Sequence, residues 1–135
     1  MSEFEYVRVV DTAALARLGA DERFSQKLID ADSGAQATSV GYIRTPPGGG
    51  SPRGLHTHDW EQIFFVLEGT MAIEVDGRRF DAGPGSLVVF PQGVAHRNWN
   101  DTAAPTVHLA FNAPLPAAGA ATGPTPAGSE TRGIA

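Results

Sequence analysis

Two of the four histidines in the chain, His56 and His58, are separated by a single residue. On an extended strand this spacing directs both imidazole rings to the same face. Imidazole nitrogen is a good ligand for borderline divalent metals, and the absence of cysteine leaves only nitrogen and oxygen donors in this chain. The pair therefore indicates either half of a metal site or two surface histidines, and the surrounding residues must distinguish these alternatives.

Glycines, a proline and further polar residues recur around this pair at regular intervals. A first motif has gaps of five, one, three and six residues between its members, which are Gly50, His56, His58, Gln62 and Gly69. A second motif lies about 30 residues downstream and consists of Gly85, Pro91, Gly93, His96 and Asn100. Its histidine is the third candidate ligand.

The two motifs resemble both signature motifs of the cupin superfamily at their usual spacings, over residues 50–100. This resemblance implies an all-β fold, the double-stranded β-helix or jelly-roll barrel, built from two antiparallel sheets. It also implies one divalent metal ion inside the barrel, held at the positions that His56, His58, Gln62 and His96 occupy here. Zinc, iron, manganese, nickel and copper are all compatible with such ligands.

Gln62 departs from the family pattern, because cupins most often carry glutamate at this position and Glu61 lies one residue too early. Neighbouring side chains on a strand point to opposite faces, so the two residues cannot both reach the metal without a bulge. The motif spacing favours Gln62. Four neutral ligands would leave the ion its full charge and make it a stronger Lewis acid. The three-histidine, one-glutamine set resembles that of some zinc-dependent polyketide cyclases, and related sets occur in dioxygenases and lyases.

Other side chains are candidates for the wall of a substrate pocket. Phe64 and Val66 share strand parity with Gln62, and Asn98 shares it with His96, so all three are predicted to line the pocket. For Phe64 and Val66, a position in the apolar core is an alternative of at least equal weight. His108 is the candidate catalytic base if its face of the strand points into the barrel, since it titrates near neutrality. For three more residues the sequence leaves pocket and surface positions open, namely Trp60, Arg97 and Trp99.

Short strands separated by turn residues are expected to position these groups. The chain has 16 glycines and 10 prolines, which favour many turns over long helices. Asp76 and Gly77 are a strong hairpin signal. The predicted strands of the barrel, within residues 36–112, are residues 36–44, 63–67, 71–75, 78–80, 86–90, 96–99 and 106–111.

The two ends of the chain are predicted to differ from the barrel. Residues 1–35 form a leader, in which residues 4–10 are expected to be a strand and Asp11 to cap a short helix that ends by Gly19. Residues 113–135 are rich in proline, alanine and glycine, so we expect a flexible tail. One domain is predicted, because 135 residues leave little room for a second core.

Composition and charge limit the classes of partner that this protein is expected to bind. A formal charge of −5 and a pI near 5.2 disfavour nucleic acid, whose binders concentrate Lys and Arg. No apolar stretch is long enough to span a membrane, and no signal peptide is evident, so a cytoplasmic protein is expected. The family resemblance and the apolar residues 4–10 also favour a homodimer. A small-molecule substrate is the predicted partner.

Three functions remain open from sequence. The first is a metal-dependent cyclase, isomerase or lyase, in which a Lewis-acidic ion polarises a small oxygenated, aromatic or polyketide-like substrate and either His108 or a metal-bound hydroxide moves a proton. The second is a dioxygenase that uses a redox-active ion and dioxygen. The third is a ligand-binding module without catalysis, because a fold does not dictate a function.

Overall fold

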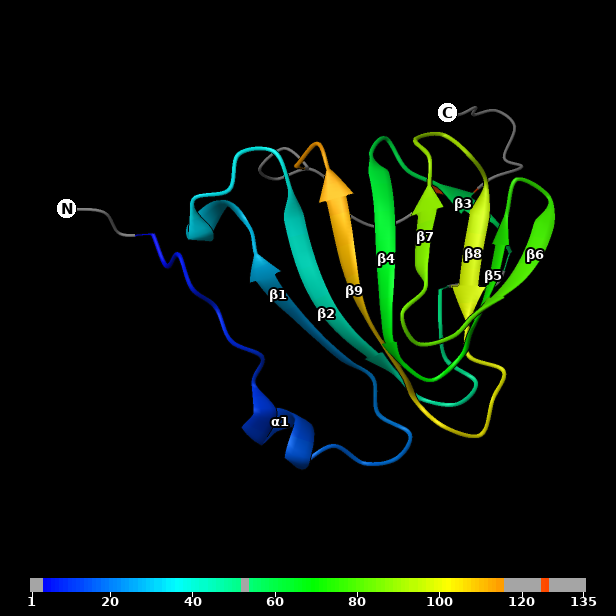
Figure 1. Ribbon diagram of the computed structural model, residues 1–135, viewed down its shortest axis with the longest axis horizontal. Helices are drawn as coiled ribbons and strands as arrows, with labels where there is room; N and C mark the ends of the chain where they lie inside the picture. Colours follow the sequence, from blue (N-terminus) through cyan, green and yellow to red (C-terminus); the bar gives the residue numbers. More distant parts are fainter. Residues whose placement is uncertain (1–3, 52–53, 116–124, 127–135) are drawn as a thin grey trace.

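Two five-stranded antiparallel sheets make up most of the computed structural model, which describes residues 4–51, 54–115, 125 and 126. One sheet has the order β1-β2-β9-β4-β7 (Figure 1). The other has the order β10-β3-β8-β5-β6. The strands of the first sheet are β1 (Phe24–Ile29), β2 (Ser39–Thr45), β4 (Glu61–Glu68), β7 (Leu87–Phe90) and β9 (Thr106–Ala113). Those of the second are β3 (His56–Thr57), β5 (Met71–Val75), β6 (Arg78–Ala82), β8 (His96–Trp99) and β10 (Thr125–Pro126). The all-β jelly-roll fold predicted from the sequence is confirmed.

The seven barrel strands predicted from alternation are all present, with ends that differ by a few residues. The β5–β6 hairpin turns at Asp76 and Gly77, whose φ angles of 53° and 76° are those that a two-residue hairpin turn requires. The sequence did not predict β1, which lies within the assigned leader but pairs with β2 along its whole length. Sheet hydrogen bonding therefore begins before residue 36.

The leader contains the predicted helix but not the predicted strand. Helix α1 (Thr12–Ala16) is capped by Asp11, whose carboxylate accepts a hydrogen bond from the Ala14 amide at 2.9 Å. Residues 4–10 form no strand, so that expectation was wrong. A side chain, rather than a neighbouring strand, binds the backbone at the end of this segment. The Gln26 side chain of β1 donates to the Val9 carbonyl at 3.0 Å and accepts from the Asp11 amide at 2.8 Å. Side-chain contacts thus replace a strand ladder.

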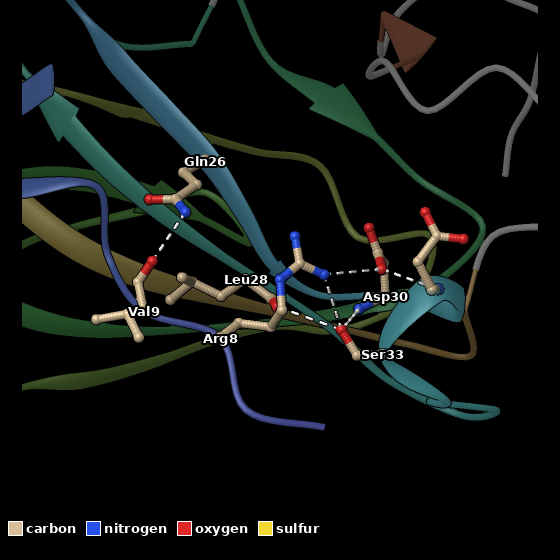
Figure 2. A network of polar contacts seen from close by, with 7 residues as sticks. Arg8, Val9, Gln26, Leu28, Asp30 and Ser33 are labelled. Atoms are coloured by element: carbon tan, nitrogen blue, oxygen red, sulfur yellow. Dashed lines mark hydrogen bonds and ion pairs between the residues drawn. The ribbon is translucent and has the colours of Figure 1, made fainter. Parts of the chain in front are cut away.

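A polar network holds the leader against the loop that follows β1 (Figure 2). Arg8 donates to the Ser33 hydroxyl at 3.1 Å and lies 3.8 Å from the Asp30 carboxylate. Asp30 in turn caps the short 3-10 helix η1 (Ala31–Ser33). The leader therefore runs along the β1 edge of the first sheet.

The C-terminal residues are described only in part. Of the predicted tail, residues 116–124 and 127–135 lie outside the described residues, while Thr125 and Pro126 pair with Thr57 and His56 of β3. None of the described helices has the length and apolar character needed to cross a membrane.

The apolar core fills the space between the two sheets. It consists of buried side chains from five strands, namely Phe64, Val66, Met71, Ile73, Ala82, Phe90 and Ala110. Phe64 and Phe90 meet edge to face with their ring centroids 4.9 Å apart. Buried polar residues adjoin this core, and three of them are the histidines described next.

Candidate metal centre and cavity

Three histidines converge on one point, two of them on neighbouring strands and the third directly after one of these strands. His56 of β3 pairs directly with His96 of β8, and His58 follows two residues after His56. The ring centroids of His56 and His58 lie 4.4 Å and 4.6 Å from that of His96, and one ring nitrogen of each histidine lies within 4.8 Å of the other two. All three residues are buried. This is the one group of histidine and acidic side chains with metal-site spacing among the described residues.

A glycine-rich loop brings β3 to β8. The backbone amides of Gly48 and Ser51 donate to the carbonyls of Asn100 and Asn98, at 2.8 Å and 2.9 Å. Between them, Gly50 has a φ of 145°, and a Cβ atom there would lie 2.5 Å from the Trp99 Cα atom. Only glycine permits so close an approach. The loop therefore fixes the position along β8 at which β3 begins, and it places His56 opposite His96.

The three imidazoles are held neutral, as metal ligands must be. Burial, together with the neighbouring histidines, lowers the pKa of His56 to about 4 and that of His58 to about 3. Burial also lowers the pKa of His96. His96 Nδ1 lies 3.0 Å from the Val94 carbonyl, which can only accept, so Nδ1 carries the proton and Nε2 presents a lone pair.

The donor set fits a divalent ion. The His96 Nε2 and His56 Nδ1 atoms are buried, and neither has a hydrogen-bond partner among the described residues. Such unsatisfied buried atoms are costly unless another group occupies the space between them. Two nitrogens bound to one zinc ion at about 2.1 Å lie roughly 3 to 4 Å apart. Small rotations of the rings would therefore bring the three nitrogens to bonding distance.

Gln62 lines the same cavity as His56 and His58, whereas Glu61 is exposed on the opposite face of β4. The Gln62 Nε2 atom donates to Asn112 Oδ1 at 2.9 Å, and the Asn112 Nδ2 atom donates to the Ser39 hydroxyl at 3.3 Å. The three residues form one row across β4, β9 and β2. Because its nitrogen is engaged by Asn112, Gln62 keeps its carbonyl oxygen as the acceptor atom.

The cluster opens into a cavity of about 440 Å³ between the two sheets. His108 of β9 also lines this cavity, so the face of β9 that the sequence left open points inward. Its ring centroid lies 4.2 Å from that of Phe64, and neither ring nitrogen has a hydrogen-bond partner among the described residues. Burial, with a smaller contribution from Arg23, lowers the pKa of His108 to about 4. The imidazole is therefore neutral at physiological pH.

The predicted pocket residues divide into two groups. Phe64 and Asn98 line the cavity together with three of the proposed ligands, His56, His58 and Gln62. Val66 does not line it, since it is fully buried in the apolar core. Val66 lies on the same face of β4 as Phe64, as predicted, but side chains of the core surround it there.

The three residues that the sequence left open are now placed. Trp60 lines the cavity, where it stacks on His58 with the ring planes 7° apart. Arg97 and Trp99 do not line it, and the Arg97 guanidinium instead lies 4.2 Å from the centre of the Trp99 ring. Alternation along β8 explains this division, because His96 and Asn98 take the inner face.

Sequence inspection missed several residues of the cavity, among them Asn112 and Arg23. Asn112 shares strand parity with His108 and Ala110, so this periodicity was an available signal. Arg23 had no such signal, because it directly precedes β1, the strand that was not predicted.

A cupin domain model matches residues 41–111, which is more than half of the chain and includes all four proposed ligands. The chain belongs to the cupin family. It is a small cupin with two antiparallel sheets, and its three clustered histidines could bind a metal. Comparison with curated proteins gave no match.

Several solved structures resemble this cupin over most of its length. The polyketide cyclase RemF from Streptomyces resistomycificus is 27% identical, with a TM-score of 0.61, and the match covers 84% of this chain and 79% of RemF. A sugar phosphate isomerase of the cupin superfamily from Silicibacter pomeroyi is 25% identical, with a TM-score of 0.60 over 72% of this chain and 62% of the isomerase. An RmlC-like cupin from Methanocaldococcus jannaschii, 19% identical with a TM-score of 0.63, covers 84% of this chain and 93% of its own. That last likeness concerns the double-stranded β-helix fold alone.

The similar enzymes include proteins with different activities, so the fold does not select one of them. They favour a small-molecule ligand for this cupin. The homodimer expected from the sequence stays a prediction.

Proposed function

We propose that this cupin is a metal-dependent enzyme that acts on a small oxygenated molecule as a cyclase, isomerase or lyase. The observation that carries the proposal is the convergence of the His56, His58 and His96 nitrogens, next to a cavity that Gln62 and His108 also line. A purely structural histidine cluster would need hydrogen-bond partners for its buried nitrogens. Similarity to the polyketide cyclase RemF supports the same class of reaction.

The ligands in this proposal are His56, His58, His96 and Gln62, and all of them are uncharged. A bound divalent ion would supply Lewis acidity to a substrate oxygen. Asn112 would hold the Gln62 carbonyl oxygen toward the ion, because it already engages the amide nitrogen. Trp60 and Phe64 supply apolar surfaces for the substrate and limit the access of water.

His108 is proposed to move the proton. The unprotonated imidazole has both ring nitrogens free of described hydrogen bonds, so it can accept a proton from the substrate without breaking an existing contact. Its lowered pKa makes it a weak base in the buried cavity. An enolate formed on the substrate beside it would stabilise the imidazolium by charge attraction. Proton transfer is thereby favoured only when a substrate with an acidic hydrogen is present.

Metal analysis tests the ligand assignment. Freshly purified full-length protein should contain one divalent ion per chain, measured by plasma mass spectrometry, and His58→Ala should lose most of it. His108→Phe is the matched control, since it removes a buried histidine outside the cluster and should keep its metal. Unchanged metal content in His58→Ala, with its fold retained by circular dichroism, would contradict the proposal.

The identity of the metal separates this function from the other two. Zinc, or turnover that is unaffected by removal of dioxygen, supports the Lewis-acid enzyme. A redox-active ion with strictly oxygen-dependent turnover would replace it with a dioxygenase. Tight binding of a small molecule that is recovered chemically unchanged would indicate a ligand-binding module.

A further inference from the structure

Arg23 lies at the mouth of the metal cavity. It precedes β1 directly, it is among the residues that line the cavity, and it is exposed to solvent. A side chain that lines a cavity and is also exposed to solvent lies at the opening of that cavity. The charge of Arg23 also reaches the interior, because it contributes to lowering the pKa of His108.

The cavity has no other permanent charge among its described lining residues. Its remaining side chains are neutral histidines, apolar groups and uncharged polar groups, the last being Thr45, Ser51, Gln62, Asn98 and Asn112. No described carboxylate lines it. Ion pairs within the described part of the chain involve Arg8 and Arg79, whereas none involves Arg23. The Arg23 guanidinium is thus uncompensated by the described protein around the site.

We propose that Arg23 binds the carboxylate of the substrate and thereby selects aromatic or unsaturated carboxylic acids. Guanidinium groups bind carboxylates through two parallel hydrogen bonds, which fix orientation as well as affinity. A cavity of about 440 Å³ accommodates a molecule of two or three fused rings. With its acid group at Arg23, such a molecule would place its rings against Trp60 and Phe64. This inference rests on the proposed function for the chemistry that follows binding.

Arg44 provides a matched control. It lies on β2 between Ile43 and Thr45, which both line the cavity, and Arg44 itself does not. Strand alternation therefore places its side chain on the opposite face of the sheet. Arg23→Gln and Arg44→Gln remove the same charge from neighbouring parts of the fold, but only the first removes it from the cavity.

The test compares 2-naphthoate with 2-naphthamide, two ligands of equal shape that differ in charge. Binding is measured by calorimetry on the full chain, both loaded with zinc and after treatment with a chelator. Wild-type protein should bind the acid more tightly than the amide in both states. Arg23→Gln should weaken binding of the acid by about tenfold or more while leaving the amide unchanged. Arg44→Gln should match the wild type for both ligands.

Three results would overturn the proposal. One is equal affinity of wild-type protein for the acid and the amide. Another is an equal loss in both arginine variants, which would indicate only the overall charge of the protein. The last is discrimination that appears only with zinc and survives in Arg23→Gln, which would assign the carboxylate to the metal. Because the chelator-treated arm needs no metal, failure of the proposed metal site leaves the Arg23 result interpretable.

Discussion

Two cavities of similar volume in this cupin differ in their chemistry. The inner cavity, of about 440 Å³, contains histidines, amides and hydroxyls. An outer groove of about 480 Å³ lies along β6 and β7 and is lined mainly by apolar side chains, including Val75, Phe80, Leu87 and Val89. No histidine, asparagine or glutamine is among its described lining residues.

This difference shows that volume does not identify the candidate site. The inner cavity gathers buried nitrogen atoms without hydrogen-bond partners, which is costly unless a ligand satisfies them. No described residue that lines the outer groove has a buried polar atom without a hydrogen-bond partner, and its apolar residues include exposed ones such as Leu87. Strand β7 has one residue in each environment, because Phe90 is buried in the core against His96 whereas Leu87 lines the outer groove and is exposed. Substitutions on the inner side should therefore have large effects and those on the outer side small ones.

The largest effect is expected for Phe90→Ala. Phe90 is fully buried, and its ring stacks on His96 with the centroids 4.2 Å apart. Loss of the ring leaves a cavity in the core and should lower the free energy of unfolding by about 3–5 kcal/mol. Urea denaturation followed by circular dichroism measures this. A loss below about 1 kcal/mol would contradict the tight packing of Phe90 in the core and against His96.

A smaller effect is expected from protonation of His108, whose pKa is lowered from 6.5 to about 4 in the folded state. Well above pH 6.5 the residue is neutral in both states, so it contributes no pH dependence there. Between pH 6.5 and 4 the unfolded state binds a proton that the folded state excludes, and stability falls as the pH is lowered. The total loss is about 3 kcal/mol.

His108→Phe isolates this contribution. The variant lacks the titrating group, so its unfolding free energy should fall less than that of the wild type between pH 7 and 4. Urea denaturation at stepped pH values, on protein treated with a chelator, measures the difference. Parallel pH profiles for the two proteins would contradict the buried neutral state of His108.

Asn112→Leu should weaken metal binding without removing a proposed ligand. The variant loses the hydrogen bond that orients Gln62, and loss of such a supporting contact typically lowers metal affinity about 10–100-fold. Competition with a chromophoric chelator measures the affinity. Ser39→Ala breaks only the outer end of the same row and should have a smaller effect. Unchanged affinity in Asn112→Leu would argue against a role for Gln62 as a ligand.

The smallest effect is expected for Leu87→Ala, the counterpart of Phe90→Ala on the same strand. Leu87 is 71% exposed, so the substitution should change the free energy of unfolding by no more than about 0.5 kcal/mol. The same denaturation experiment measures it. A loss comparable to that of Phe90→Ala would mean that the outer groove is covered in solution, for which the homodimer predicted from the sequence is one explanation.

Sequence by itself determined the fold class and the positions of the histidine cluster. Alternation along a strand places His56 and His58 on one face and separates Gln62 from Glu61, because successive side chains point in opposite directions. Hairpin signals such as Asp76 and Gly77 located the turns. These features depend on neighbours close in the chain, so they can be recognised without a structure.

Only the tertiary structure decided which distant residues meet inside the barrel. The contact between Gln62 and Asn112 joins residues 50 positions apart, and the inward face of β9 that carries His108 depends on pairing with β2 and β4. Strand alternation defines two faces but does not say which one the second sheet covers. Arg23 lies at the cavity because it directly precedes β1. The sequence pattern of this strand is weak, but its pairing with β2 is extensive. Cross-strand pairing of distant segments, rather than local periodicity, thus determined the polar lining of the cavity.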